Sequence, residues 1–334
     1  MQPESLRPDA PELFVARRAD TKANLDYFGI GFENYDQVLD SSVGTVIEAT
    51  FDRTKVIQTI TDSGYERAGE YRGYPVFARS DVPRRVAIGD DVVVWTSAAK
   101  HELPHLEAII DTGNGESPRF HKENAAFERL TSAAGSNPYL GVNTDSQDPS
   151  DRPAMLADTI RFDDNAAYQV VHYHYTSDRI PTKQTLEAAL KEDDYRFAEK
   201  ANEFDVTIDG QLATVETQVP LRSEQDIDPK YELPQVTWGV THDEDAEKVT
   251  FRHEAGESVP ADRLYYDFAR PAAPLGRIDK RPLWTGVDTV SAGAEGEIDL
   301  TEYPDATRVH LVYSAGGTHF YVLLGFDLRG DSDG

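Results

Sequence analysis

Short runs of alternating apolar and polar residues fill the first two thirds of the chain and predict strands, helices and hairpins in a recurring order. Thr45–Phe51 has the alternation of a strand. A helix is expected next, because Asp52 is a good N-cap and Gly64 is a good residue to end it. Its apolar face comprises Val56, Ile57 and Ile60. Residues 65–79 then predict a hairpin that turns at Arg72-Gly73.

The same order returns further along the chain. Ala166–Thr176 predicts a strand, the residues after Pro181 predict a helix, and Asp209-Gly210 signals a two-residue hairpin turn. The apolar face of this helix comprises Leu186, Ala189 and Leu190. Between the two sets we expect a hairpin over 84–96 and helices over 104–112 and 123–134. We therefore predict an α+β domain over residues 21–220 with duplicated strand–helix–hairpin units and helices on one sheet face.

The pattern changes near residue 225. Residues 221–234 are charged, lack periodicity and contain Pro229 and Pro234, which is typical of a linker. The strand-like runs after it are 236–241, 248–253, 263–268, 296–300, 308–313 and 319–326. Their spacing predicts an all-β sandwich domain over 235–328. Its expected core is Trp238, Phe251, Phe268, Trp284, Val312, Tyr321 and Leu323. Flexible segments are expected at both ends, over 1–20 and 329–334.

The charge balance indicates the solvent in which the protein works. The chain of 334 residues has 60 acidic and 33 basic side chains, a formal net charge of -27, and only ten Lys. Such a charge destabilises a compact chain by self-repulsion unless salt screens it. We therefore predict a halophilic protein, and the composition resembles that of haloarchaeal proteins. The alternative is an ordinary acidic protein.

Composition also excludes several classes of partner and site. The negative charge argues against nucleic acid and anionic membrane surfaces. The absence of Cys excludes disulfides, thiolate metal sites and cysteine nucleophiles. There is no apolar run long enough for a transmembrane segment, and Met1–Glu12 has no apolar signal core. We expect either a cytoplasmic protein or the mature form of an exported one. The oligomeric state stays open.

The C-terminal part carries a first family resemblance. A strand ends at His253, Gly256-Glu257-Ser258-Val259 follows, and a "VSAG" segment precedes a final pair of strands. Val236–Phe268, Trp284–Leu300 and Ala306–Leu328 resemble the globular β domain of haloarchaeal type IV pilin-like proteins. That family has Thr-His at the strand end, where this chain has Arg252 before the His. The N-terminal pilin helix and its processing site are missing, so the resemblance implies a pilin-like domain and not a filament subunit.

A second resemblance covers the N-terminal part. Gly44–Arg79 has the order strand, "FD", helix, "GY", hairpin, and Ala87–Ser97 and Glu123–Leu130 extend the match. These segments resemble uncharacterised haloarchaeal surface proteins and predicted lipoproteins and, more distantly, bacterial surface proteins of unknown function. The resemblance implies a location at the cell surface and supplies no catalytic residues.

His101-Glu102-Leu103-Pro104-His105 matches the H-E-x-x-H pattern of zinc proteases. In that pattern two His one helical turn apart grip the metal and the Glu acts as base. Here Pro104 lies between the ligands, and Pro inside a helix costs about 3 kcal/mol or more. We expect the helix to begin near Pro104 and to leave His101 outside it, so the match is judged a false positive.

His172 and His174 are the other candidate metal ligands. They lie two apart on an expected strand and therefore face the same side. A third ligand would have to come from elsewhere, such as His101, His105 or His121. The alternative is that both lie on a solvated or helix-covered sheet face, opposite a core face formed by Val171, Tyr173 and Tyr175.

Other short patterns carry little chemistry. Asp243-Glu244-Asp245, Asp163-Asp164 and Asp193-Asp194 offer hard oxygens for calcium but lack the spacing of a known loop. Arg329-Gly330-Asp331 matches an adhesion tripeptide by chance at a polar end. No phosphate-binding loop, nucleophile elbow or kinase motif occurs. We therefore assign no catalytic or cofactor-binding residues, and no cofactor.

These observations favour a non-enzymatic, salt-adapted structural or interaction protein of the cell surface or envelope. One alternative is a cytoplasmic or surface binding module for a protein partner, which Trp238, Tyr265 and Tyr266 on sheet edges could serve. The other is a metal-dependent hydrolase built on the histidines named above.

Overall fold

The computed structural model describes residues 1–7, 9–97, 105–144, 153–164, 166–176, 179–192, 204–222, 232–269, 281–316 and 319–328. The chain divides into two compact units. The first unit comprises Met1–Arg18, Asp36–Val38 and Ile110–Ile227, and the second comprises Ala19–Tyr35, Leu39–Ile109 and Asp228–Gly334. Both are built mainly from antiparallel strands, so the α+β character and the β-rich C-terminal part are as predicted.

A five-stranded antiparallel sheet forms the centre of the first unit. Its order is β10-β11-β9-β8-β7. The strands are β7 (Tyr139–Asn143), β8 (Met155–Phe162), β9 (Ala167–His174), β10 (Asp205–Asp209) and β11 (Leu212–Val219). The predicted hairpin turn at Asp209-Gly210 is present, and Gly210 has a φ of 57°. The helices are α4 (Phe120–Glu123), α5 (Ala125–Ala134) and α6 (Lys183–Glu192).

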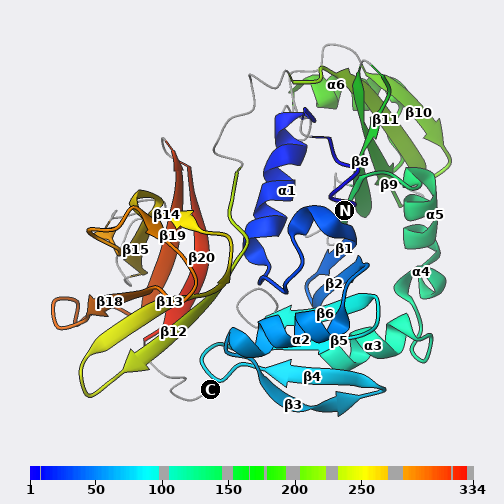
Figure 1. Ribbon diagram of the computed structural model, residues 1–334. Helices are drawn as coiled ribbons and strands as arrows, with labels where there is room; N and C mark the ends of the chain where they lie inside the picture. The colour runs from blue at the N-terminus through cyan, green and yellow to red at the C-terminus, as the bar shows by residue number, and fades with distance from the viewer. Residues whose placement is uncertain are drawn as a thin grey trace. The chain divides into compact units, whose positions relative to one another are not determined.

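Helices cover both faces of this sheet, where the sequence predicted one (Figure 1). On one face Leu130 and Ala134 of α5 pack with Ala157 and Leu212. On the other, Leu186 and Leu190 of α6 pack with apolar residues of β9, β10 and β11. The difference arises because α5 and α6 are both amphipathic, and each needs an apolar face to cover.

Residues 1–20 also differ from the prediction of a flexible segment. Leu6, Ala10 and Phe14 are buried and pack with Ile160 of β8 and neighbouring strand residues. Phe14 belongs to α1 (Glu12–Asn24). Prolines and charged residues dominate the sequence here, so these few apolar side chains formed no recognisable pattern.

The second unit contains a six-stranded sheet of order β1-β2-β6-β5-β4-β3. The strands are β1 (Tyr35–Ser41), β2 (Gly44–Ala49), β3 (Glu66–Tyr71), β4 (Tyr74–Ala78), β5 (Arg84–Ile88) and β6 (Val92–Ser97). The helices α2 (Arg53–Asp62) and α3 (Leu106–Gly113) lie where the sequence predicts them. Asp52 caps α2 by accepting hydrogen bonds from the amides of Thr54 and Lys55. Arg72 and Gly73 both have positive φ, as a tight hairpin turn requires.

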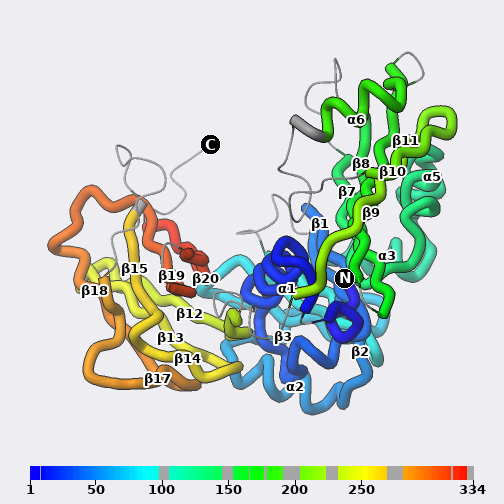
Figure 2. The backbone as a smooth tube through the Cα atoms, turned by 90° about the horizontal axis from the view of Figure 1, so that it is seen from above, coloured from blue at the N-terminus to red at the C-terminus, as the bar shows by residue number. Residues whose placement is uncertain are grey.

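The C-terminal strands pack as two main sheets around one core (Figure 2). One sheet is β12-β13-β18 and the other is β16-β15-β19-β20. Their bounds are β12 (Val236–Asp243), β13 (Lys248–Gly256), β15 (Leu264–Ala269), β16 (Arg281–Pro282), β18 (Glu295–Asp299), β19 (Arg308–Gly316) and β20 (His319–Asp327). β14 (Val259–Pro260) pairs with β17 (Thr289–Val290). Short 3-10 turns lie at Phe32–Asn34 and Ala261–Arg263.

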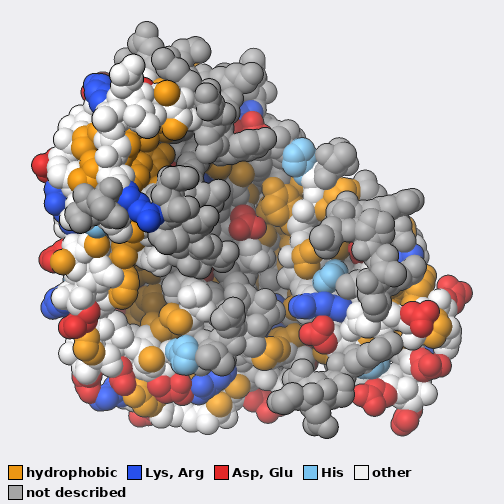
Figure 3. Space-filling view, turned by 180° about the vertical axis from the view of Figure 1, so that it is seen from behind, with side chains coloured by type: hydrophobic (Ala, Val, Ile, Leu, Met, Phe, Trp, Pro, Cys, Tyr) orange, Lys and Arg blue, Asp and Glu red, His pale blue; other side chains and the backbone are white. Residues whose placement is uncertain are grey.

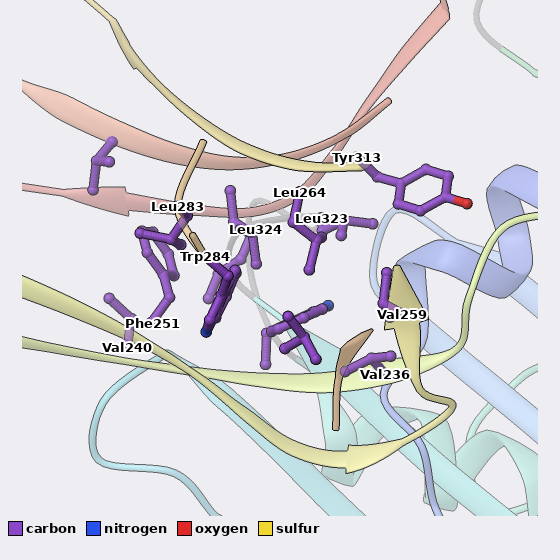
Figure 4. Close-up of a cluster of buried hydrophobic side chains, with 14 of the residues drawn as sticks. Val236, Val240, Phe251, Val259, Leu264, Leu283, Trp284, Tyr313, Leu323 and Leu324 are labelled. Atoms are coloured by element: carbon purple, nitrogen blue, oxygen red, sulfur yellow. The ribbon is translucent and has the colours of Figure 1, made fainter. Parts of the chain in front are cut away.

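Side chains from both sheets point into the space between them, as expected for a sandwich (Figure 4). Of the predicted core residues, Trp238, Phe251, Phe268, Trp284 and Leu323 belong to this cluster. Tyr321 is half-buried against it, and Val312 is buried elsewhere. Ala19 and Val82 join the cluster from outside the C-terminal segment. Independent folding of residues 235–328 stays a prediction, and most of the predicted linker lies outside the described residues.

Acidic side chains are spread over the face of the molecule seen in Figure 3 and do not gather in one patch. This distribution matches the even spread of Asp and Glu along the sequence. Among the helices that the structure describes, none is long and apolar enough to cross a membrane.

Candidate functional site

The two histidines of β9 lie on the sheet face that α5 covers. His172 and His174 are both buried, and His172 Nδ1 lies 3.0 Å from the Thr214 hydroxyl. Burial lowers the pKa of both, and the charge of Arg129 lowers that of His174 further. Val171, Tyr173 and Tyr175 form the opposite, core-facing side, as predicted. These contacts are those of histidines packed beneath a helix.

The other proposed metal ligands do not complete a site. His105 is exposed and precedes α3, which begins at Leu106, close to the predicted start. His101 and the rest of the H-E-x-x-H pattern up to Pro104 lie outside the described residues. In the part of the chain that the structure describes, no group of three or more His, Asp or Glu side chains is arranged to hold a metal ion.

The remaining sequence candidates fall into turns or the core. Asp243 accepts a hydrogen bond from the Ala246 amide, and Asp163 accepts one from the Ala166 amide, so each closes a turn. Asp193-Asp194 and Arg329–Asp331 lie outside the described residues. Trp238 is only 2% exposed and packs against Trp284 and His253, so it cannot serve as an edge-strand docking residue. The alternating pattern of its strand did not indicate whether Trp238 faces the core or the solvent.

A pocket in the first unit brings together residues that the sequence did not single out. It opens on the sheet face that also carries α6 and the first half of α1. We call it the sheet pocket, and its volume is about 380 Å³. It is lined by Arg17, Tyr139, Gly141, Val142, Asn143, Leu156, Asp158 and Val171. Pockets of this size accommodate small molecules.

An ion pair lies at the base of the sheet pocket. Arg17 Nη1 of α1 lies 2.5 Å from Asp158 Oδ2 of β8, and Gln169 Nε2 of β9 donates to Asp158 Oδ1 at 2.9 Å. The Asp158 side chain is 9% exposed and that of Arg17 is 34% exposed. Because two donors hold the carboxylate, its charge is compensated where water is scarce.

Tyr139 forms the wall next to this pair. Its ring packs edge-on against Phe14 at 5.3 Å, and the Arg17 guanidinium lies 5.1 Å from the ring centroid. A Cβ on Gly141 would lie 2.7 Å from the Tyr139 hydroxyl, so glycine leaves room for the phenol to lie along the strand. Burial raises the pKa of Tyr139, which keeps the hydroxyl protonated.

One signal in the sequence could have revealed the pocket. In β8, Leu156, Asp158 and Ile160 share one sheet face, and in β9, Gln169 and Val171 share the same face. A buried acid and a buried amide thus occupy positions where alternation requires apolar residues. Arg17, which completes the pair, is separated from Asp158 by 141 residues, and no local pattern joins them.

Comparison with known proteins adds little. No protein-family model matches the chain, and no curated protein matches it. It is similar to a solved structure titled "Structure of crystal form III of TP0453" with a TM-score of 0.38 and 10% sequence identity. The alignment covers 64% of this chain and 88% of that one. A likeness of this size supports no inference about fold or function.

Proposed function

We propose that the protein is a non-enzymatic binding protein whose first unit holds a small molecule in the sheet pocket. The observation that carries the proposal is the ion pair of Arg17 and Asp158 beside an open volume of about 380 Å³. Pockets that bind small molecules combine apolar walls with a few placed polar groups. Here Leu156 and Val171 form the apolar walls, and the ion pair and Asn143 supply the polar groups.

The setting of this binding protein is part of the proposal. The net charge of -27 with ten Lys supports a salt-adapted protein of a haloarchaeon. The resemblances of the N-terminal part to haloarchaeal surface proteins, and of the C-terminal part to pilin-like β domains, support a role at the cell surface or envelope. In that role the C-terminal sandwich would contact a protein partner.

The duplication of the N-terminal strand–helix–hairpin units is also proposed, and the strand order supports it. In the six-stranded sheet, β2 precedes α2 and pairs with β6, the last strand of the sheet. In the five-stranded sheet, β9 precedes α6 and pairs with β11, again the last strand. The helix is followed by four strands in the first case and by two in the second, and the last of them pairs with the strand before the helix.

A ligand screen with a pocket-filling variant tests the binding function. Small molecules are screened by saturation-transfer NMR against the full chain in about 3 M KCl, where charge repulsion is screened. Leu156→Trp places an indole in the sheet pocket and is expected to abolish the signals of the bound compounds. Gln218→Trp adds the same ring at an exposed position on the opposite sheet face and is expected to keep them. Signals that survive Leu156→Trp would contradict the proposal.

A further inference from the structure

We propose that the sheet pocket selects uncharged ligands that combine an amide or hydroxyl group with a branched aliphatic body. This inference rests on the proposed binding function and adds the chemical class of the ligand. It follows from the internal charge balance of the pocket, from its polar groups and from its apolar walls.

The charges within the sheet pocket already cancel. Among the described residues that line it, Arg17, Tyr139 and Asp158 carry the ionisable groups. The hydroxyl of Tyr139 stays protonated because burial raises its pKa. Arg17 and Asp158 lie 2.5 Å apart and compensate each other. The described lining residues therefore carry no net charge for a ligand to neutralise.

A charged ligand would disturb this balance. A carboxylate bound through another N–H of Arg17 would place a second negative charge next to Asp158, whose side chain is 9% exposed. Two carboxylates that share one guanidinium repel each other, which weakens binding. An ammonium group bound to Asp158 would likewise lie next to the positive charge of Arg17. An amide or hydroxyl can share the existing donors and acceptors without separating the pair.

The walls set the shape of the rest of the ligand. Leu156 of β8 and Val171 of β9 sit side by side with Asp158 on the sheet face, so apolar surface begins next to the polar base. The ring of Tyr139 continues it along β7. The volume of about 380 Å³ lies in the range of small-molecule sites and leaves space for a short branched chain beside these residues.

Three probes with one carbon skeleton test the selectivity. They are 4-methylpentanamide, 4-methylpentanoate and 4-methylpentan-1-amine at neutral pH, titrated into the full chain by calorimetry or NMR. We expect the amide to bind at least about tenfold more tightly than either ion, a difference of about 1.4 kcal/mol. Tighter binding of either ion would overturn the inference and leave the binding function standing. If none of the three binds, the inference is wrong, and the ligand screen with Leu156→Trp decides the binding function separately.

Variants that change the charge of the sheet pocket are expected to change which of the three probes binds most tightly. Asp158→Asn leaves Arg17 uncompensated and is expected to shift the preference to the carboxylate. Arg17→Gln leaves Asp158 uncompensated and is expected to shift it to the amine. The double variant Arg17→Gln with Asp158→Asn is neutral again and should restore the preference for the amide, which keeps the test valid if a single variant is unstable.

A matched control separates local charge from net charge. Arg161→Gln removes a positive charge from the same sheet, but Arg161 pairs with Glu216 on the opposite face. The ranking of the three probes should not change in this variant. A ranking that follows Arg161→Gln as strongly as Arg17→Gln would show that overall charge governs binding, and the inference would be wrong.

Discussion

Each compact unit contains an arginine paired with an aspartate inside the protein, but the two pairs have different surroundings. In the first unit, Arg17 is 34% exposed and reaches Asp158 at the base of an open pocket. In the second unit, the Arg79 side chain is 1% exposed. Arg79 Nε and Nη2 donate to the two carboxylate oxygens of Asp81 at 2.8 and 2.6 Å, and Nη1 donates to the Ser63 carbonyl at 2.6 Å.

The surroundings of Arg79 contain further polar groups of the protein. Glu254 of β13 lies 3.5 Å from Arg79 Nη2, and the Val240 amide of β12 donates to Asp81. Nearby, Asp26 accepts hydrogen bonds from Arg84 and Tyr65. We call Arg79, Asp81, Ser63 and Glu254 the Arg79 network. A buried pair whose partners fill the space around it holds elements together, whereas a pair beside a cavity can meet a ligand.

Changing the salt concentration tests the repulsion between surface charges separately from these buried pairs. It is expected to have the largest effect on folding stability. At about 1 M salt the screening length is about 3 Å, which suppresses repulsion between exposed carboxylates. We expect both units to lose cooperative folding below roughly 0.5 M salt, because the net charge is -27. Melting curves between about 0.1 M and 3 M KCl measure this. Curves that do not change would show that the inner pairs and cores suffice without screening.

Proteolytic cleavage of the chain tests how much the stability of the C-terminal strands depends on the Arg79 network. We expect limited proteolysis in high salt to cut between Leu221 and Pro234. The fragment 235–328 should show strand-rich circular dichroism, because nearly all of its core cluster comes from its own residues. It should be less stable than in the full chain, because Glu254 and the Val240 amide lose Arg79 and Asp81. An unfolded fragment in about 3 M KCl would mean that residues 235–328 are not a domain.

The strands of this fragment show how far sequence patterns reach. All six predicted runs form strands, because alternation and turn residues are local signals. The Arg79 network could not be predicted, since Arg79 and Glu254 are far apart in sequence and each looks like a surface charge. Arg17 and Asp158 are likewise far apart in sequence, although Asp158 occupies a core-facing position of its strand. Buried polar residues are chosen by tertiary packing, so the candidate site was missed, and of the elements that carry it only β9 was predicted.

Removing each arginine measures the difference between the two pairs directly. Arg79→Ala leaves the Ser63 carbonyl without its side-chain donor and Asp81 without its buried counter-charge, and should lower the free energy of unfolding by about 3–5 kcal/mol. Arg17→Ala leaves Asp158 with Gln169 and partial access to water, so a loss of about 1–2 kcal/mol is expected. Arg67→Ala, at an exposed pair with Glu70, should change it by less than about 0.5 kcal/mol. Equal losses of unfolding free energy for Arg79→Ala and Arg17→Ala would contradict the difference between the two pairs.

Glycine substitutions probe the space around the same pairs. A Cβ on Gly239 would lie 2.3 Å from Glu254 Oε1 and 2.9 Å from Arg79 Nη2. Because both groups are held in place, Gly239→Ala should lower the free energy of unfolding by about 1–3 kcal/mol. A Cβ on Gly141 meets the Tyr139 hydroxyl, which can turn into the sheet pocket, so Gly141→Ala should cost less than about 1 kcal/mol. Chemical denaturation in high salt compares the two, and the reverse order would contradict this account.

Acidification should affect both units through buried histidines. Burial lowers the pKa of His172 in the first unit and of His253 in the second below the ordinary value of 6.5. His253 Nε2 donates to the Glu257 carbonyl at 2.8 Å, inside the sandwich. The unfolded chain therefore binds protons at a higher pH than the folded chain does. The stability that neutral histidines provide is complete above pH 6.5 and is lost as the pH falls through their folded pKa values.

The expected slope is at most about 1.4 kcal/mol per pH unit for each histidine. Unfolding free energies measured between about pH 5 and 7 in high salt give this slope. Replacing His172 by Gln, or His253 by Gln, should each flatten the curve, because each removes one such proton difference. His319→Gln, at an exposed position, is the control and should leave the curve unchanged. If the two buried variants retain the full slope, protonation of these histidines does not limit acid stability in either unit.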